Sequence, residues 1–450
     1  MTAAPSVITA PWPVVAETHE RGRWAYRICR ALLFGALFSI VFLPEFPRAG
    51  GETLSPLYTK LVAGFRYIDV LVLLLAVAHI VAMGSLRGER LRFPRALTAP
   101  GVAFLVCIAV AIAYGARHGG SNFFFDWRGL ALGIALYVVW SCWLRNPDDV
   151  ADALRVFLGY VGVRLALLFV AYFSGDRDSL AGVSIPIFDG PVLSCVVFTG
   201  LLAFQFYASA ASARRKPLWA SLGIVAYLLV LLCLRRTYWG ELAIGTVALL
   251  LLGGRMRNLL FIGAAIAVAA GVLGGSFSGR VLSLDFTSND TEFSADNADH
   301  VYDLIDAWSQ VRQSPVMGIG LGTSYPTWRI RNWKPDSVMV HNAPLHVWLK
   351  YGAAGLACYL WFHAALLTWL VRRWKQAVPE QRAFLSATLA YLTAQFLMTL
   401  GFAPWPYSEL QMTTLISFLL AAAIAAQSSP STVCYESPFR FRHHAIVQQR

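Results

Sequence analysis

The sequence predicts an all-α, polytopic membrane protein, and three observations carry this prediction. First, 57% of the 450 residues are hydrophobic and only 14% are charged, with a mean hydropathy of +0.56, whereas a soluble domain has about 25% charged residues. Second, apolar residues gather in segments of about 20, the length that a helix needs to cross a bilayer. Third, Lys and Arg concentrate in alternate loops between these segments. This composition excludes an ordinary soluble enzyme, a disordered chain and a disulfide-stapled secreted domain.

The apolar segments divide the chain into about 12 transmembrane helices and one long periplasmic loop. A cytoplasmic N-terminal tail at 1–25 precedes transmembrane helices 1 to 9 at 26–275, and the loop at 276–350 follows. Transmembrane helices 10 to 12 at 351–427 lead to a cytoplasmic C-terminal tail at 428–450. Because the positive-inside rule places the basic loops in the cytoplasm, we expect both termini there and the long loop on the outer side, which in a bacterium is the periplasmic face of the inner membrane. The basic loops contain Arg87, Arg90, Arg92, Arg95, Arg145, Arg214, Arg215, Lys216, Arg255, Arg257, Arg372, Arg373, Lys375 and Arg382.

The net charge of +12 has a simple explanation in such a protein. Basic residues in cytoplasmic loops fix the orientation and meet anionic membrane lipids, so no nucleic acid partner is expected. The seven cysteines are scattered, form no Cys-x-x-Cys pair and mostly lie in apolar segments. We therefore interpret them as small buried hydrophobes, and we expect no metal site.

The long loop contains one segment with helical periodicity. Its apolar residues recur at the spacing of an amphipathic helix, and Pro315 ends the pattern. Such a helix lies on the membrane surface, roofs a cavity between spans, or packs on neighbouring loops, and these three alternatives stay open. The apolar positions are Val301, Leu304, Ile305, Trp308 and Val311.

A glycine-rich stretch and a histidine follow this helix. The alternate glycines of 318–322 allow a tight turn and a close approach to other groups, but their spacing is not that of a nucleotide-binding loop. His341 lies at the expected membrane boundary, where an imidazole can take a proton near neutral pH. The alternative is a surface histidine that caps the following helix.

Two arginines stand on the side of the membrane where the charge pattern does not expect them. Arg235 and Arg236 occupy a tight turn that faces outward in the predicted topology. The planar guanidinium donates paired hydrogen bonds and stays protonated, which suits phosphate. Glu241, within two turns, is placed to orient one of them. The alternatives are snorkelling to lipid head groups and a structural Arg–Glu pair.

Other charged residues within or near the spans have weaker signals. Arg66 and Asp69 are three residues apart and are expected to neutralise each other on one helix face. Arg128 follows an aromatic belt at 123–127, at the outer interface. Arg164 is expected to face the bundle interior, as a second candidate for phosphate binding.

Three motifs in this order resemble the O-antigen ligase and O-antigen (exopolysaccharide) polymerase superfamily of bacterial inner-membrane glycosyltransferases. The turn at 234–237 is similar to the family's Ser-Arg-Gly/Thr, with Arg236 on the family's arginine. Residues 314–322 are similar to the family's Pro-Leu-x-Gly-[IV]-Gly-x-Gly. His341 and the four residues after it are similar to His-Asn-x-x-Leu, and a Gly-x-x-Gly at 352–355 follows as in the family. The layout, with one long outer loop after the ninth span, is also similar.

The resemblance implies a GT-C-like fold and a glycosyl transfer. The implied donor is a glycan on undecaprenyl diphosphate, and the implied acceptor is a sugar hydroxyl on the lipid A core (ligase) or on a lipid-linked repeat unit (polymerase). By the same resemblance His341 is the catalytic base, with Asn342 beside it, and Arg236, Arg235 and Arg280 hold the diphosphate. The implied displacement inverts the anomeric centre and needs no metal or cofactor. The acidic loop residues are interpreted as a solvated face or as hydrogen-bonding partners of the sugar; they are Asp296, Asp299, Asp303 and Asp306.

Two positions depart from the family pattern. The family's arginine about 15 residues before the proline of the glycine motif is His300 here, so the second phosphate ligand stays open between Arg280 and His300. Lys350 stands where an acidic residue is frequent.

Other readings of the whole chain stay open. Ligase and polymerase are not separated, although a single dominant loop favours the ligase. A transporter or flippase for a lipid-linked saccharide also has about twelve spans. Against it, the halves show no repeat symmetry, and the candidate residues lie at the outer boundary rather than the midplane. A membrane scaffold of a polysaccharide assembly complex is the third alternative.

Overall fold

The structure is a computed structural model of the chain, and it describes most of the helical segments. The described residues are 31, 34–35, 67–82, 92–118, 123–173, 177–180, 183–186, 190–209, 215–232, 236–253, 263, 291–326, 336–337, 340–401 and 410–426. The fold is built from helices, with two short antiparallel ribbons. It is consistent with the predicted all-α membrane protein. The helices are α2 (Tyr67–Ala82), α3 (Arg95–Arg117), α4 (Phe123–Trp143), α5 (Pro147–Phe173), α6 (Gly190–Ser209), α7 (Lys216–Leu232), α8 (Arg236–Leu251), α11 (Thr291–Gln313), α12 (Ala343–Gln376), α13 (Pro379–Gly401) and α14 (Leu410–Ala425). The ribbons pair β1 (Arg177–Leu180) with β2 (Val183–Pro186) and β3 (Tyr325–Pro326) with β4 (Asp336–Ser337).

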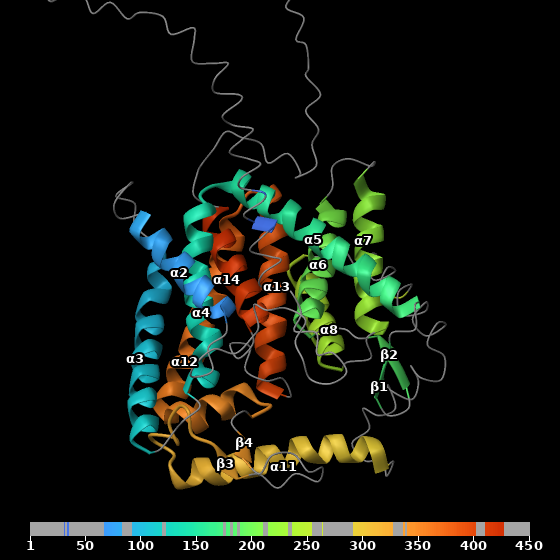
Figure 1. Cartoon of the computed structure of the whole chain (residues 1–450). Helices are drawn as coiled ribbons and strands as arrows, with labels where there is room; N and C mark the ends of the chain where they lie inside the picture. Colours follow the sequence, from blue (N-terminus) through green and yellow to red (C-terminus); the bar gives the residue numbers. More distant parts are fainter. Residues whose placement is uncertain are drawn as a thin grey trace, which may run out of the picture.

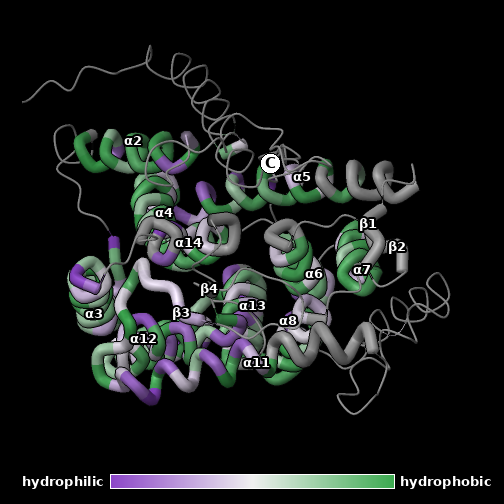
Figure 2. Tube along the Cα trace, turned by 60° about the horizontal axis from the view of Figure 1, so that its bottom comes forward, coloured by the Kyte–Doolittle hydropathy of each residue, from purple (hydrophilic) through white to green (hydrophobic). Residues whose placement is uncertain are grey.

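The apolar helices stand side by side as a bundle, and α11 runs across one end of it (Figure 1). The closest pairings are α6 with α7, α4 with α14, α3 with α12 and α8 with α13. Buried aromatic rings connect the middle of the bundle: Trp140 lies 5.0 Å from Phe418, and Phe198 lies 5.7 Å from Tyr391, between ring centroids. Most of the bundle is hydrophobic along its length, whereas α11 alternates hydrophilic and hydrophobic residues (Figure 2).

Three helical segments within the described residues are long and apolar enough to cross a membrane: Arg95–Arg117, Ala343–Gln376 and Gln381–Leu400. Shorter apolar segments accompany them, at Tyr67–Val81, Arg128–Trp143, Leu193–Ser209, Lys216–Leu232, Thr237–Leu251 and Thr413–Ala425. The membrane character of the chain is thus supported. The number of twelve spans is not reached within the described part and stays a prediction.

Helix α11 confirms the periodic segment, but its apolar positions divide between two faces. Leu304 and Val311 join Ala307 on the side that packs into a small core with Tyr325, Val340 and Leu349. Val301, Ile305 and Trp308 remain exposed. The single stripe expected from the sequence is therefore two adjacent stripes, because a helix turns by about 100° per residue and only one of its sides meets the bundle.

The described cysteines agree in part with their interpretation as buried hydrophobes. Cys195 is buried, whereas Cys107, Cys142 and Cys358 are half-buried, and all four are free thiols. The sulfur atoms of Cys107 and Cys358 lie 3.7 Å apart where α3 meets α12.

Candidate active site at one end of the helix bundle

The glycine-rich stretch forms a loop that packs against a kink in α12. Gly352 interrupts this helix with φ 71°, and a Cβ there would lie 1.9 Å from the carbonyl oxygen of Val316. The backbone groups at the kink bond to the loop instead: Ala353 N–H donates to Pro315 O at 3.1 Å, and Ile319 N–H donates to Leu349 O at 2.7 Å. Glycine is required at the kink because the φ is positive and the two backbones touch.

The other side of this loop lies against α3. Leu321 N–H donates to Ala111 O at 3.0 Å. A Cβ on Gly115 would lie 1.9 Å from Leu321 O, and Gly320, at φ 87°, meets the backbone of Gly115 in turn. The expectation of a tight turn with close backbone approach is confirmed, since Gly318, Gly320 and Gly322 all have positive φ. The loop is thus wedged between two helices of the bundle.

A buried ion pair fastens the end of this loop to α4 and α12. The Nζ atom of Lys350 lies 2.9 Å from Oδ2 of Asp126, and their side chains are 0% and 1% exposed. Lys350 also donates to the carbonyl oxygen of Thr323, and Gly322 N–H donates to Asp126 Oδ2 at 2.8 Å. Lys350, which departs from the family pattern, therefore has a buried partner in Asp126. A buried ammonium group requires a carboxylate and carbonyl oxygens around it.

The first turn of α12 is closed by Asn342, beside the candidate base. Its Oδ1 accepts a hydrogen bond from Leu345 N–H at 2.9 Å, which is the bond of an N-cap. Its Nδ2 donates to Leu400 O, at the end of α13, at 2.7 Å. The alternative reading of His341 as the helix cap is wrong, since Asn342 has that position.

A buried carboxylate holds His341. Nδ1 of His341 lies 3.2 Å from Oδ2 of Asp303, and the backbone N–H of His341 donates to the same oxygen at 3.1 Å. The hydroxyl of Tyr325 donates to Oδ1 of Asp303 at 2.9 Å. The Asp303 side chain is 1% exposed, whereas that of His341 is 30% exposed.

This contact determines which ring nitrogen of His341 can act as a base. An ionised carboxylate only accepts hydrogen bonds, so Nδ1 carries the proton and the lone pair of the neutral ring lies on Nε2. A buried carboxylate behind a half-exposed imidazole is the arrangement that orients a general base. The structure thus gives His341 an oriented side chain suited to proton transfer.

Asp303 and Tyr325 were not identified as site residues from the sequence. The interpretation of Asp303 as a solvated or sugar-binding residue is wrong, because its side chain is buried under His341. The sequence did contain a signal for the burial of Asp303, because Asp303 lies four residues before Ala307 and shares its helix face. Tyr325 had no comparable signal, since it lies in a short ribbon beyond the glycine motif.

The arginines expected to bind phosphate are only partly within the described residues. Arg235 and Arg280 lie outside them, and the side chains of Arg236, the first residue of α8, and His300, on α11, are not described. The backbone nevertheless relates α8 to the histidine. A Cβ on Gly240 would lie 2.5 Å from the sulfur of Met398, two residues before the Leu400 carbonyl that Asn342 contacts.

The start of α8, and with it position 236, therefore lies at the same end of the bundle as His341. This end is the one that α11 crosses (Figure 1). Position 236 and the histidine are thus brought to one end of the molecule from distant parts of the sequence.

The remaining candidates have structural surroundings. Nε of Arg128 lies 2.9 Å from both carboxylate oxygens of Asp69, and Nη2 lies 2.7 Å from Oδ1. Asp69 thus pairs with Arg128 between α2 and α4, whereas Arg66 lies outside the described residues and its expected pairing with Asp69 stays a prediction. Glu241 is fully buried on α8. Arg164 lies on α5, and its side chain is not described.

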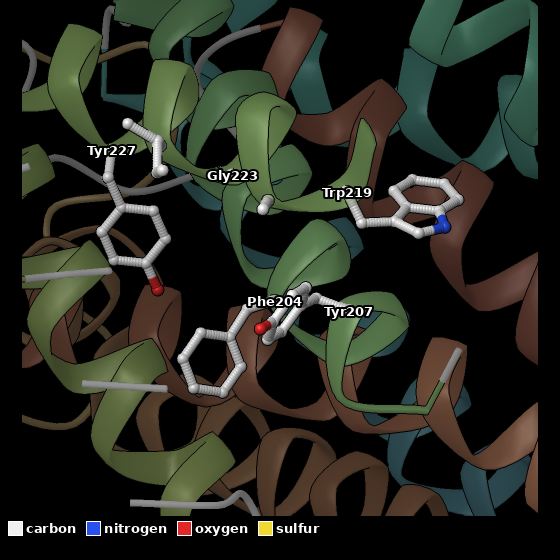
Figure 3. A pocket seen from close by; sticks show the side chains of 7 residues that line it. Phe204, Tyr207, Trp219, Gly223 and Tyr227 are labelled. Carbon is white, nitrogen blue, oxygen red and sulfur yellow. The ribbon is translucent and has the colours of Figure 1, made fainter. Parts of the chain in front are cut away.

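A pocket between α6 and α7 lies apart from these residues. Figure 3 shows Phe204, Tyr207, Trp219 and Tyr227 around it, and Gly223 gives it room. The hydroxyl of Tyr227 lies 2.8 Å from Oγ1 of Thr246. The lining contains no Asp, Glu, His, Lys or Arg. Its polar side-chain groups are two tyrosine hydroxyls and an indole N–H, so this pocket offers no carboxylate or imidazole for proton transfer.

No group of three His, Cys, Asp or Glu side chains within the described part of the chain is placed to hold a metal ion. That transfer needs no metal stays a prediction.

A bundle of apolar helices with an oriented imidazole at one end defines the class: a membrane protein with an acid–base site beside its helix ends. Comparison with known families makes this more specific. Residues 200–360 match the family described as O-antigen ligase, and this match supports the O-antigen ligase and polymerase superfamily that the motifs indicated. The matched segment includes α8, α11, the glycine loop and His341. Comparison with curated proteins gave no significant match.

Proposed function

We propose that this protein transfers a glycan from undecaprenyl diphosphate to a sugar hydroxyl at the periplasmic face of the bacterial inner membrane. The family match supports a glycosyl-transferring membrane enzyme of the ligase or polymerase type. The observation that carries the proposal for this site is the contact between Nδ1 of His341 and buried Asp303. It supplies what the reaction needs most, a base whose lone pair is directed away from its carboxylate partner.

His341 acts on the acceptor in this mechanism. Nε2 takes the proton of the acceptor hydroxyl as its oxygen attacks the anomeric carbon of the donor sugar. The bond between that carbon and the diphosphate oxygen breaks, and undecaprenyl diphosphate leaves with the electron pair. The imidazolium that forms is stabilised by the Asp303 carboxylate. Direct displacement inverts the anomeric centre, and no step requires a metal.

The leaving diphosphate requires positive charge on its oxygens. We propose Arg236 and Arg280, with Arg235, for this role, because guanidinium groups form paired hydrogen bonds to phosphate. The position of the start of α8 at the His341 end of the bundle supports Arg236. His300 is the alternative to Arg280, since it lies on α11 one turn before Asp303.

The acceptor that we propose first is the lipid A core, because the matched family is described as a ligase. A polymerase would use a lipid-linked repeat unit instead. The proposed orientation has both termini in the cytoplasm and α11 in the periplasm, from the alternation of basic loops.

The direct test is transfer by purified full-length protein with undecaprenyl-diphosphate-linked glycan, once with lipid A core and once with repeat units alone. We expect turnover that persists in EDTA and is lost in His341→Ala, and the productive acceptor separates ligase from polymerase. Normal turnover in folded His341→Ala would remove the histidine from the mechanism. If folded wild-type protein turned over neither acceptor, vesicle flipping assays would test the transporter alternative.

The phosphate role has its own test in Arg236. If bidentate contact matters, Arg236→Lys should lose nearly as much activity as Arg236→Ala, because an ammonium cannot form the planar fork. A fully active lysine variant would show that position 236 contributes only charge or membrane anchoring.

A further inference from the structure

Helix α11 has an exposed apolar face in addition to the one that packs on the bundle. Val301, Ile305 and Trp308 are 48%, 56% and 38% exposed. They are spaced by four and three residues, so they lie on one face of the helix. Val311, which is buried, and Leu304, which is partly buried, lie on the neighbouring side. Leaving large apolar side chains in water along two turns is unfavourable, which calls for something to cover them.

The exposed face continues beyond the helix onto the glycine loop and α12. Val316 and Met317, directly after α11, are exposed. The ring of Trp308 lies 5.4 Å from that of Trp348, whose Nε1 donates to Pro315 O at 2.9 Å. Trp348 belongs to α12, a helix long and apolar enough to cross a membrane. The α11 apolar face, defined as Val301, Tyr302, Ile305, Trp308, Val316 and Met317, therefore adjoins the start of a membrane-spanning helix.

The composition of this face fits the boundary between lipid head groups and acyl chains. Tryptophan and tyrosine are enriched at that depth, and arginine reaches from apolar surroundings to phosphate. The guanidinium carbon of Arg312 lies 5.6 Å from the centre of the Trp308 ring, and Tyr302, nearer the start of the same helix, is also exposed. Helix α11 also lies across the end of the bundle, transverse to α13, as a helix in the plane of a membrane would (Figure 1).

We propose that the α11 apolar face rests on the phospholipid bilayer, at the head-group and acyl-chain boundary of the leaflet at this end of the bundle. Lipid is the occupant because the face adjoins α12 and combines aromatic, aliphatic and cationic side chains. The buried side of the same helix connects the lipid contact to the candidate active site. Asp303 on the buried side holds His341, so seating α11 on the lipid fixes the height of His341 relative to the head groups. This consequence rests on the proposed function, whereas the lipid contact itself does not.

The test uses photo-crosslinking of the purified full-length protein in vesicles of phosphatidylethanolamine and phosphatidylglycerol. Benzoylphenylalanine replaces Ile305 in one sample and Gln310 in the matched control, because Gln310 is a half-buried polar residue that lies about 140° around the helix from Ile305. We expect phospholipid adducts at position 305 with a yield several-fold above that at position 310. Before reconstitution, size-exclusion chromatography in detergent checks that both variants elute like the wild-type protein and are therefore folded.

Two results would overturn the lipid contact. Equal adduct yields at the two positions would show that the face is not turned to the bilayer. Adducts of position 305 with another protein in native membranes, without lipid adducts in vesicles, would assign the face to a protein partner. Neither result depends on glycosyl transfer, so failure here is distinguishable from failure of the proposed enzyme activity.

Discussion

Asp126 and Asp303 are both buried aspartates that accept hydrogen bonds from the segments around the glycine loop, but they face different partners. Asp126 faces Lys350, and neither side chain reaches solvent. Asp303 faces His341, whose imidazole is 30% exposed. A permanently buried ion pair can only hold elements together, whereas a carboxylate behind an accessible, titratable ring can support proton transfer. The partner and its exposure, rather than the carboxylate, separate the structural site from the chemical one.

The largest expected effect comes from breaking the structural pair. Lys350→Met should lower the free energy of unfolding by about 3–5 kcal/mol, because it leaves Asp126 as an uncompensated buried charge. The measurement is unfolding in detergent. The double variant Asp126→Asn with Lys350→Met removes both charges and keeps an acceptor for Gly322 N–H, so it should recover most of this loss. An equal loss in the single and double variants would contradict the coupling of the two charges.

Breaking the chemical pair should act on turnover rather than on folding. Asp303→Asn should lower kcat by about a hundredfold, because the ring loses the charge that fixes its tautomer and stabilises the imidazolium. The KM for the donor should change little, since Asp303 does not touch it in the proposed mechanism. Kinetics with undecaprenyl-diphosphate-linked glycan check both quantities.

Asp306→Asn provides the matched control, because Asp306 lies on the same helix and is only half-buried. It should retain the wild-type kcat. A loss of kcat equal to that of Asp303→Asn would mean that α11 responds to any lost charge, and the contrast between the two buried aspartates would disappear.

The same contrast explains what the sequence can and cannot predict. Hydropathy indicated the membrane class, and periodicity indicated α11, because both signals are local. The motif around His341 also lies within one short stretch. The ion pairs, in contrast, join residues that are far apart in the sequence. Asp126 pairs with Lys350, and Asp69 pairs with Arg128, because the helices that carry them pack together.

Amphipathic spacing has a similar limit. It predicts that a helix has an apolar side, but not which apolar residues will meet the bundle and which will stay exposed. The sequence therefore predicts a solvated or sugar-binding Asp303, whereas its side chain shares the buried face of Ala307. It also predicts Trp308 and Val311 in one stripe, of which only Val311 is buried. Both errors arise because the sequence does not show which side of α11 the end of the helix bundle covers. The helix itself is predicted correctly.

The smallest expected effect concerns Asn342. This residue is next to His341 in the chain, but its contacts are those of a structural residue. Asn342→Ala should lose about 2 kcal/mol of unfolding free energy, as the sum of about 1 for the helix cap and about 1 for the hydrogen bond to Leu400. Asn342→Ser keeps an oxygen for Leu345 N–H but is too short to reach Leu400 O, so it should lose only the second part. Unfolding of the two variants in detergent separates the contributions. If Asn342→Ser were as unstable as Asn342→Ala, the link to α13 would be the whole contribution of Asn342, and the cap would add nothing to the position of His341.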